Sequence, residues 1–210
     1  MIRIIRDRLT VRGVGRAVRA FSRSTGSRAA RPMRLAASAA VVAVAVGIVG
    51  AAQANTAQPV RAKVTHGVLR VNGTKASEKI ALRLQAGQPG FLQVDVGDDG
   101  SAEFSFDRSG IEQIVVNAGD GDDQVRMDES NGAFNVGIRT TIRGGDGDDT
   151  IAGGAGAETL RGGDGDDSID GNVGADVGLM GDGDDTFVWD NGDGSDVIEG
   201  QEGADTMIFN

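Results

Sequence analysis

Acidic side chains recur at a regular spacing in the C-terminal half of this chain of 210 residues. They stand in glycine-rich turns, and the last acid of each turn returns after nine residues, or after eleven at one point. These acids are Asp149, Glu158, Asp167, Asp176, Asp185, Asp196 and Asp205. Ca²⁺ takes carboxylate and main-chain carbonyl oxygens in flexible geometry, whereas Mg²⁺ demands a tight octahedron and keeps its waters. The acids therefore predict several Ca²⁺ sites.

The residue types argue against other metal sites and against a catalytic site. The chain has no Cys and a single His, so Zn²⁺ and Cu²⁺ lack their usual ligands. An EF-hand needs Glu at the twelfth position, but counting from Asp146 that position holds Ala157. His66 is the only imidazole, and no nucleophile elbow or phosphate loop is present, so we expect no catalytic site.

The acids belong to a repeat of nine residues, of which residues 144–152 (GGDGDDTIA) are a clear copy. Each copy is a turn followed by a very short strand with one apolar residue, as Ile151 is here. Two copies therefore make one coil of about eighteen residues. This register places Asp149, Asp167 and Asp185 on one edge of the stacked coils, and the intervening acids on the other.

The copies resemble the GGxGxDxUx nonapeptide of RTX (haemolysin-type) calcium-binding repeats, over residues 144–208 and more weakly over 118–125. The resemblance implies an all-β fold, a parallel β-roll (β-solenoid), with several Ca²⁺ ions bound between successive turns. On the better-matched edge it assigns the ions to Gly145, Gly147, Asp148, Asp149, Gly163, Gly165, Asp166, Asp167, Gly181, Gly183, Asp184 and Asp185. Elsewhere it adds Asp123, Glu158, Asp176 and Asp196. The second edge departs from the pattern, since Glu158 replaces an aspartate and Gly178 replaces an apolar residue.

The first 54 residues have the composition of a secretory signal. Residues 1–34 carry ten arginines and one acid, residues 35–52 are apolar, and Ala52-Gln53-Ala54 fits a cleavage site. We expect cleavage after Ala54 and a secreted protein. An uncleaved membrane anchor is the alternative, because the apolar run approaches the length of a bilayer span.

The remaining segments differ in pattern. Residues 55–116 alternate polar and apolar side chains and predict a β-rich capping segment, with a tight turn at Asn72-Gly73. Residues 117–143 hold an isolated repeat copy and a connector, in which the acids could also form a flexible linker. Residues 144–210 form the predicted β-roll.

Residues 55–210 carry 11 basic and 30 acidic side chains, so we expect neither a nucleic-acid partner nor, after cleavage of the signal, a membrane. The sequence predicts an exported, non-enzymatic calcium-binding module outside the cell or in the cell wall, and it identifies no protein or cell-wall partner. The alternative is a truncated remnant of an RTX-containing hydrolase or toxin that has lost its catalytic domain.

Overall fold

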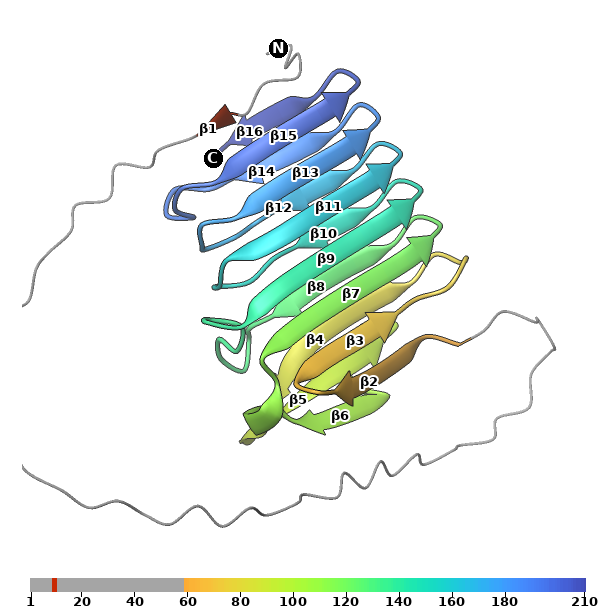
Figure 1. Cartoon of the computed structure of the whole chain (residues 1–210), viewed down its shortest axis with the longest axis vertical. Coiled ribbons are helices and arrows are strands. Elements are labelled where there is room, and N and C mark those ends of the chain that lie inside the picture. The colour runs from red at the N-terminus through yellow and green to blue at the C-terminus, as the bar shows by residue number, and fades with distance from the viewer. Residues whose placement is uncertain (1–8, 11–58) are drawn as a thin grey trace, which may run out of the picture. The chain divides into compact units, whose positions relative to one another are not determined.

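Two sheets of mostly parallel strands form the part of the chain that the computed structural model describes, residues 9–10 and 59–210 (Figure 1). Sheet A has the order β1 (Leu9–Thr10), β15 (Val197–Glu202), β13 (Val177–Asp182), β11 (Glu158–Asp164), β9 (Arg139–Asp146), β7 (Gln113–Asp120), β3 (Val68–Asn72), β2 (Arg61–Thr65). Sheet B has the order β16 (Thr206–Phe209), β14 (Thr186–Trp189), β12 (Ser168–Asp170), β10 (Thr150–Ala152), β8 (Gln124–Asp128), β4 (Lys79–Gln85), β5 (Gln88–Val96), β6 (Phe104–Asp107). Apart from strand β1, the predicted signal, residues 1–54, lies outside the described residues.

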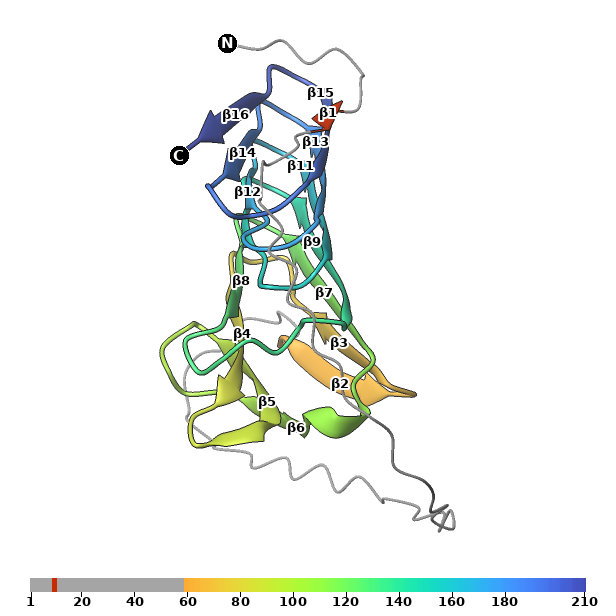
Figure 2. The ribbon, with the colours of Figure 1, turned by 90° about the vertical axis from the view of Figure 1, so that its left-hand side faces the viewer.

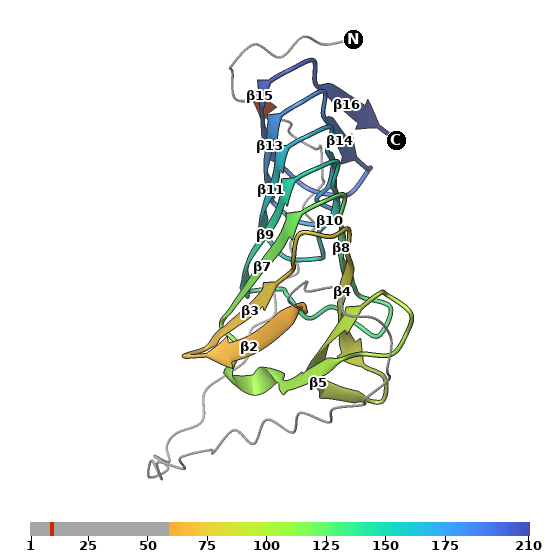
Figure 3. The same ribbon diagram turned by 90° about the vertical axis from the view of Figure 1, so that its right-hand side faces the viewer.

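From β7 onward the chain alternates between the two sheets, so that each pair of strands completes one coil (Figures 2 and 3). Successive coils stack as parallel strands, with Thr159 beside Val177 in sheet A and Ile151 beside Ile169 in sheet B. Both pairs are 18 residues apart, which is the coil length that the repeat predicts. The predicted all-β fold and parallel β-roll are therefore confirmed.

A thin apolar interior lies between the two sheets. Side chains alternate between the inside and the outside of each strand, so that each short strand of the repeats contributes one main apolar residue. Sheet B supplies Ile151, Ile169 and Phe187 to this interior, all at most 2% exposed. Gly178 leaves a gap in the opposite row, and the Phe187 ring fills it, since a Cβ on Gly178 would lie 3.0 Å from that ring.

The stacking extends on the N-terminal side of residue 144. Strand β9 pairs in parallel with β7, and β7 pairs with β3, at offsets of 26 and 45 residues. The longer connections hold the loop 129–138 and the hairpin of β5 and β6, which ends in the 3-10 turn η1 (Arg108–Gly110). Residues 118–125 therefore belong to the stack, and the flexible-linker interpretation is wrong. The segment boundaries expected from the sequence stay predictions.

A tight turn in this region lies at a different place from the predicted one. His66 and Gly67 form the tight turn between antiparallel strands β2 and β3, with φ values of 49° and 76°. This conformation suits a two-residue hairpin. The tight turn predicted at Asn72-Gly73 is wrong: Asn72 ends strand β3, Gly73 donates its N–H to the carbonyl oxygen of Asn117 at 2.8 Å, and residues 73–78 then cross from sheet A to sheet B as part of a coil.

Candidate calcium sites

The inward-facing acids gather in two columns, one on each edge of the roll. We call the turns that lead from sheet A to sheet B the first edge, and those that lead back the second edge. The column of the first edge holds Asp123, Asp149, Asp167, Asp185 and Asp205. The column of the second edge holds Glu158, Asp176 and Asp196. The edges are those that the repeat predicts, and the copy with Asp123 extends the first edge by one turn.

Each aspartate of these columns ties its turn to the preceding one. The Oδ1 atom of Asp167 accepts the backbone N–H of Asp149 at 2.8 Å, and Oδ1 of Asp185 accepts that of Asp167 at 2.7 Å. The second edge repeats the arrangement, since Oδ1 of Asp196 accepts the N–H of Asp176 at 2.9 Å. One oxygen of every carboxylate is thereby used within the protein.

The other oxygen has no partner. In the part of the chain that the structure describes, these buried Oδ2 atoms make no hydrogen bond: Asp123, Asp149, Asp167, Asp176, Asp185, Asp196 and Asp205. A buried carboxylate oxygen without a donor is costly, so native structures pair such atoms with a donor or a cation. The orphan oxygens fit Ca²⁺, which is held by oxygen ligands alone.

Glycines bring the turns close enough to share an ion. Gly163 has φ of 141°, and a Cβ there would lie 1.9 Å from the carbonyl oxygen of Gly145 in the preceding turn. A Cβ on Gly162 would lie 2.0 Å from Oδ2 of Asp167. Only glycine leaves this space open, and it keeps main-chain carbonyls beside the orphan oxygens.

No group of three or more acidic, His or Cys side chains meets at one point within the described residues. An ion between these turns must therefore take part of its shell from main-chain carbonyls. Ca²⁺ accepts such ligands readily.

Burial makes the inward acids hold their protons unusually tightly. Loss of solvent raises the pKa of Asp176 to about 8 and the pKa of Asp167 to about 7, although a hydrogen bond from a backbone N–H lowers each pKa in part. The same cause raises the pKa of Asp123, Asp149 and Asp185 to about 6. A bound cation supplies the positive charge that these carboxylates otherwise lack.

A second, exposed ladder of acids runs along the rim of the first edge. Oδ1 of Asp148 accepts the N–H of Asp166 at 2.9 Å, and Oδ1 of Asp166 accepts that of Asp184 at 2.8 Å. The structure thus places the side chains of Asp148, Asp166 and Asp184 outside the buried column, while their turns keep the predicted glycines beside it. These three carboxylates hold neighbouring turns together.

Glu158 differs from the aspartates of its column. Its Oε1 accepts the side-chain N–H of Asn135 at 3.0 Å, and its Oε2 accepts the backbone N–H of Gly154 at 2.9 Å. Burial raises its pKa to about 7, although the bond from Gly154 opposes the shift. Asn135 stands in the loop 129–138, outside any repeat, so the sequence contained no signal for its role.

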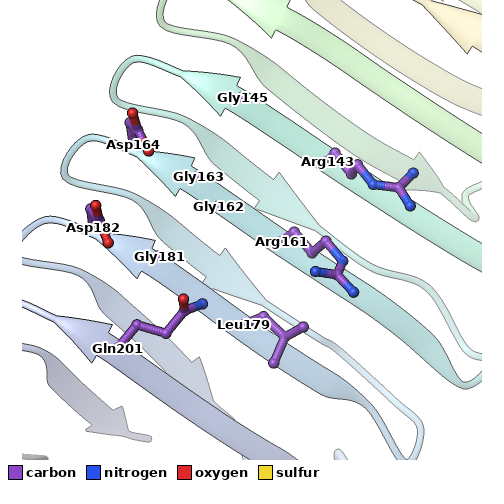
Figure 4. Close-up of a pocket in the computed structure, with 10 residues that line it drawn as sticks. All are labelled: Arg143, Gly145, Arg161, Gly162, Gly163, Asp164, Leu179, Gly181, Asp182 and Gln201. Carbon is purple, nitrogen blue, oxygen red and sulfur yellow. The ribbon is translucent and has the colours of Figure 1, made fainter. Parts of the chain in front are cut away.

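The outer face of sheet A carries a shallow groove of about 370 Å³ (Figure 4). Gly145, Gly163 and Gly181 lie along it, because the glycine column leaves no side chains there. Arg143 and Arg161 project from neighbouring strands on one side of these glycines. The groove is separate from the inward columns and contributes none of the orphan oxygens.

Comparison with known families agrees with this geometry. Residues 141–157, 153–187 and 190–209 match the RTX calcium-binding nonapeptide repeat in four copies. Neither the curated proteins nor the solved structures include a match to the chain. The C-terminal part of the chain is therefore an array of RTX repeats, folded as a calcium-binding β-roll. In the described residues, no helix is long and apolar enough to cross a membrane.

Proposed function

We propose that this chain is an exported calcium-binding protein in which Ca²⁺, held between successive turns, completes the fold of residues 144–210. The observation that carries the proposal is the set of seven buried aspartate oxygens without a partner. The ions would be held by those oxygens together with carbonyls of the glycine turns. Bound Ca²⁺ supplies the positive charge that stacked carboxylates require.

The composition of the repeats supports the coupling between binding and folding. A unit of nine residues buries about one large apolar side chain, which is little compared with the entropy lost by ordering the unit. The columns also bring carboxylates together, as Asp167 lies between Asp149 and Asp185. Burial is the largest cause of the raised pKa of Asp167, and the negative charges of these two neighbours raise it further. Because the binding geometry exists only in the coiled state, the free energy of binding becomes free energy of folding.

Coupled folding suits export through the predicted N-terminal signal. The cytoplasm is expected to hold far less free Ca²⁺ than the exterior, so the repeats would remain unfolded until they had crossed. We propose a non-enzymatic role outside the cell, facing a protein or the cell wall. Protease and esterase assays of the purified chain, with and without Ca²⁺, should give no activity, and turnover would favour the hydrolase or toxin remnant.

The substitution Asp167→Ala tests the proposed sites. It removes an orphan oxygen in the middle of the first edge, whereas Glu158→Ala removes a carboxylate whose oxygens are both satisfied within the protein. We expect Asp167→Ala to reduce the number of bound ions, measured by equilibrium dialysis and elemental analysis, more than Glu158→Ala does. Equal losses would contradict the assignment of the sites.

A further inference from the structure

On both edges the first acid of the stack is a glutamate, whereas the acids that follow are aspartates. On the first edge, Glu78 precedes Asp123 at the equivalent position, because its backbone N–H donates to Oδ1 of Asp123 at 2.6 Å, as in the later turns. The second edge starts with Glu158, whose N–H binds Oδ1 of Asp176 at 2.7 Å. Both positions carry glutamate, and every later acid of either column is aspartate.

The additional methylene group lets each glutamate reach back into its own turn. Oε2 of Glu78 accepts the N–H of Thr74 at 3.0 Å, and the Thr74 hydroxyl bonds Oε1. Oε2 of Glu158 accepts the N–H of Gly154 at 2.9 Å. In both cases the donor lies four residues before the acid. The glutamate carboxylates thus use the oxygen that the aspartates leave without a partner.

Asn135 fills the remaining space above the turn of Glu158. Its side chain is fully buried, and its Nδ2 donates to Oε1 of Glu158. A Cβ on Gly154 would lie 2.4 Å from this Nδ2, and one on Gly156 would lie 2.8 Å from the Asn135 carbonyl oxygen. An amide N–H is a donor and cannot bind a cation. Asn135 Oδ1 stays without a partner, but one neutral oxygen beside a satisfied carboxylate is a poor site for a hard ion.

We infer that Asn135 and Glu158 close the second edge without a metal ion, so that its Ca²⁺ column starts only at Asp176. The amide lies where, elsewhere in the roll, a preceding repeat turn lies and a cation would bind. Glu78 and Thr74 close the first edge in a similar way, ahead of Asp123. Glutamate in place of aspartate as the last acid of a turn thereby marks a turn that needs no Ca²⁺. This inference rests on the proposed calcium binding, since it assigns positions within the same columns.

A matched pair of variants tests the assignment. Glu158→Gln and Asp176→Asn each replace a carboxylate by the amide of the same shape, in neighbouring turns of one column. The number of Ca²⁺ ions bound by each purified chain is measured by equilibrium dialysis and elemental analysis, and the melting temperature is measured with Ca²⁺ present. We expect Glu158→Gln to keep every ion while its melting temperature falls. We expect Asp176→Asn to lose at least one ion.

Asn135→Ala gives a second test that leaves the acid in place. It removes the donor without changing any carboxylate, so we expect the full number of ions here as well. Loss of an ion in Glu158→Gln or Asn135→Ala, from a wild type that binds Ca²⁺, would overturn this inference alone and make the pair a calcium site. A wild-type chain without bound Ca²⁺ would overturn the proposed function and the inference with it.

Discussion

The N-terminal and C-terminal coils of the roll place different side chains at the same inward position. Along the second edge this position holds Leu69, Ile114, Thr140, Glu158, Asp176 and Asp196. All six residues are at most 2% exposed, and the backbone pairing is continuous along them. The column therefore changes from apolar contacts to carboxylates without a change of fold. The same coil thus accepts apolar or acidic side chains at this position, and we infer that the acids, and not the coil, create the need for a cation.

Buried aspartates also have different partners in the two regions. In the N-terminal coils the buried Asp95 forms an ion pair with Arg83 at 2.6 Å and accepts the N–H of Gly100. The inward aspartates of the repeats have no basic partner in the part of the chain that the structure describes. We infer that the N-terminal coils are stable by themselves and that the repeats depend on a cation from solution.

Removal of Ca²⁺ should give the largest difference between the regions. Without ions, we expect residues 144–210 to lose most of their amide protection, because their carboxylates repel one another and their apolar interior is thin. Residues 59–128 should stay protected by their larger core. Hydrogen exchange with mass spectrometry, in Ca²⁺ and in chelator, measures both regions in one sample. Equal loss of protection in the two regions would show that they do not differ in their dependence on Ca²⁺.

Shortening one core side chain in each region tests separately how the stability of that region depends on Ca²⁺. Leu82 and Ile169 are both fully buried, and replacement of such a residue by Ala costs about 2–5 kcal/mol. Leu82→Ala should lower the free energy of unfolding with or without Ca²⁺. Ile169→Ala should do so only with Ca²⁺, because in chelator the repeats are already unfolded. Denaturant titrations under both conditions provide the values, and an Ile169→Ala effect that persists in chelator would contradict the account.

The raised pKa values predict an unusual dependence on pH in the absence of Ca²⁺. Burial raises the pKa of Asp167 to about 7 and that of Asp176 to about 8, so the folded state binds protons more tightly than the unfolded state. The metal-free repeats should therefore gain stability as the pH falls from about 8 towards about 4. With Ca²⁺ the sign reverses, because protons compete for the same oxygens. Far-UV circular dichroism of the Ca²⁺-free protein, which should gain β structure as the pH falls, and melting temperatures of the Ca²⁺-loaded protein across this range test both signs.

The exposed ladder should give the smallest effect. Asp166 uses Oδ1 to accept the N–H of Asp184 at 2.8 Å, and a hydrogen bond of this kind contributes about 1 kcal/mol. Asp166→Ala should lower the free energy of unfolding of the Ca²⁺-loaded protein by about that amount. Asp166→Asn keeps the acceptor, so it should cost less. A loss of bound Ca²⁺ in Asp166→Asn would show that the rim carboxylate binds an ion.

The sequence predicted the repeats well because one physical constraint fixes them. An acid and an apolar residue in every nine positions determine the coil length, the two edges and the neighbours of Asp167. The N-terminal coils were harder to predict, because their neighbouring turns are offset by 26 and 45 residues instead of 18. Leu69 and Ile114 occupy the acid position as ordinary strand residues, so nothing in their type reveals the column. Asn135 acts through a loop contact, which has no periodicity to detect.

A calcium titration followed by far-UV circular dichroism tests the central claim most directly, with bound ions counted in the same samples. Extracellular modules bind Ca²⁺ at about 10⁻⁴–10⁻³ M. We expect residues 144–210 to be largely unfolded in chelator and to gain β structure cooperatively as Ca²⁺ reaches the millimolar range, with Mg²⁺ a weak substitute. A spectrum and a melting temperature that chelation leaves unchanged would contradict the claim that Ca²⁺ completes the fold, even if ions were found bound.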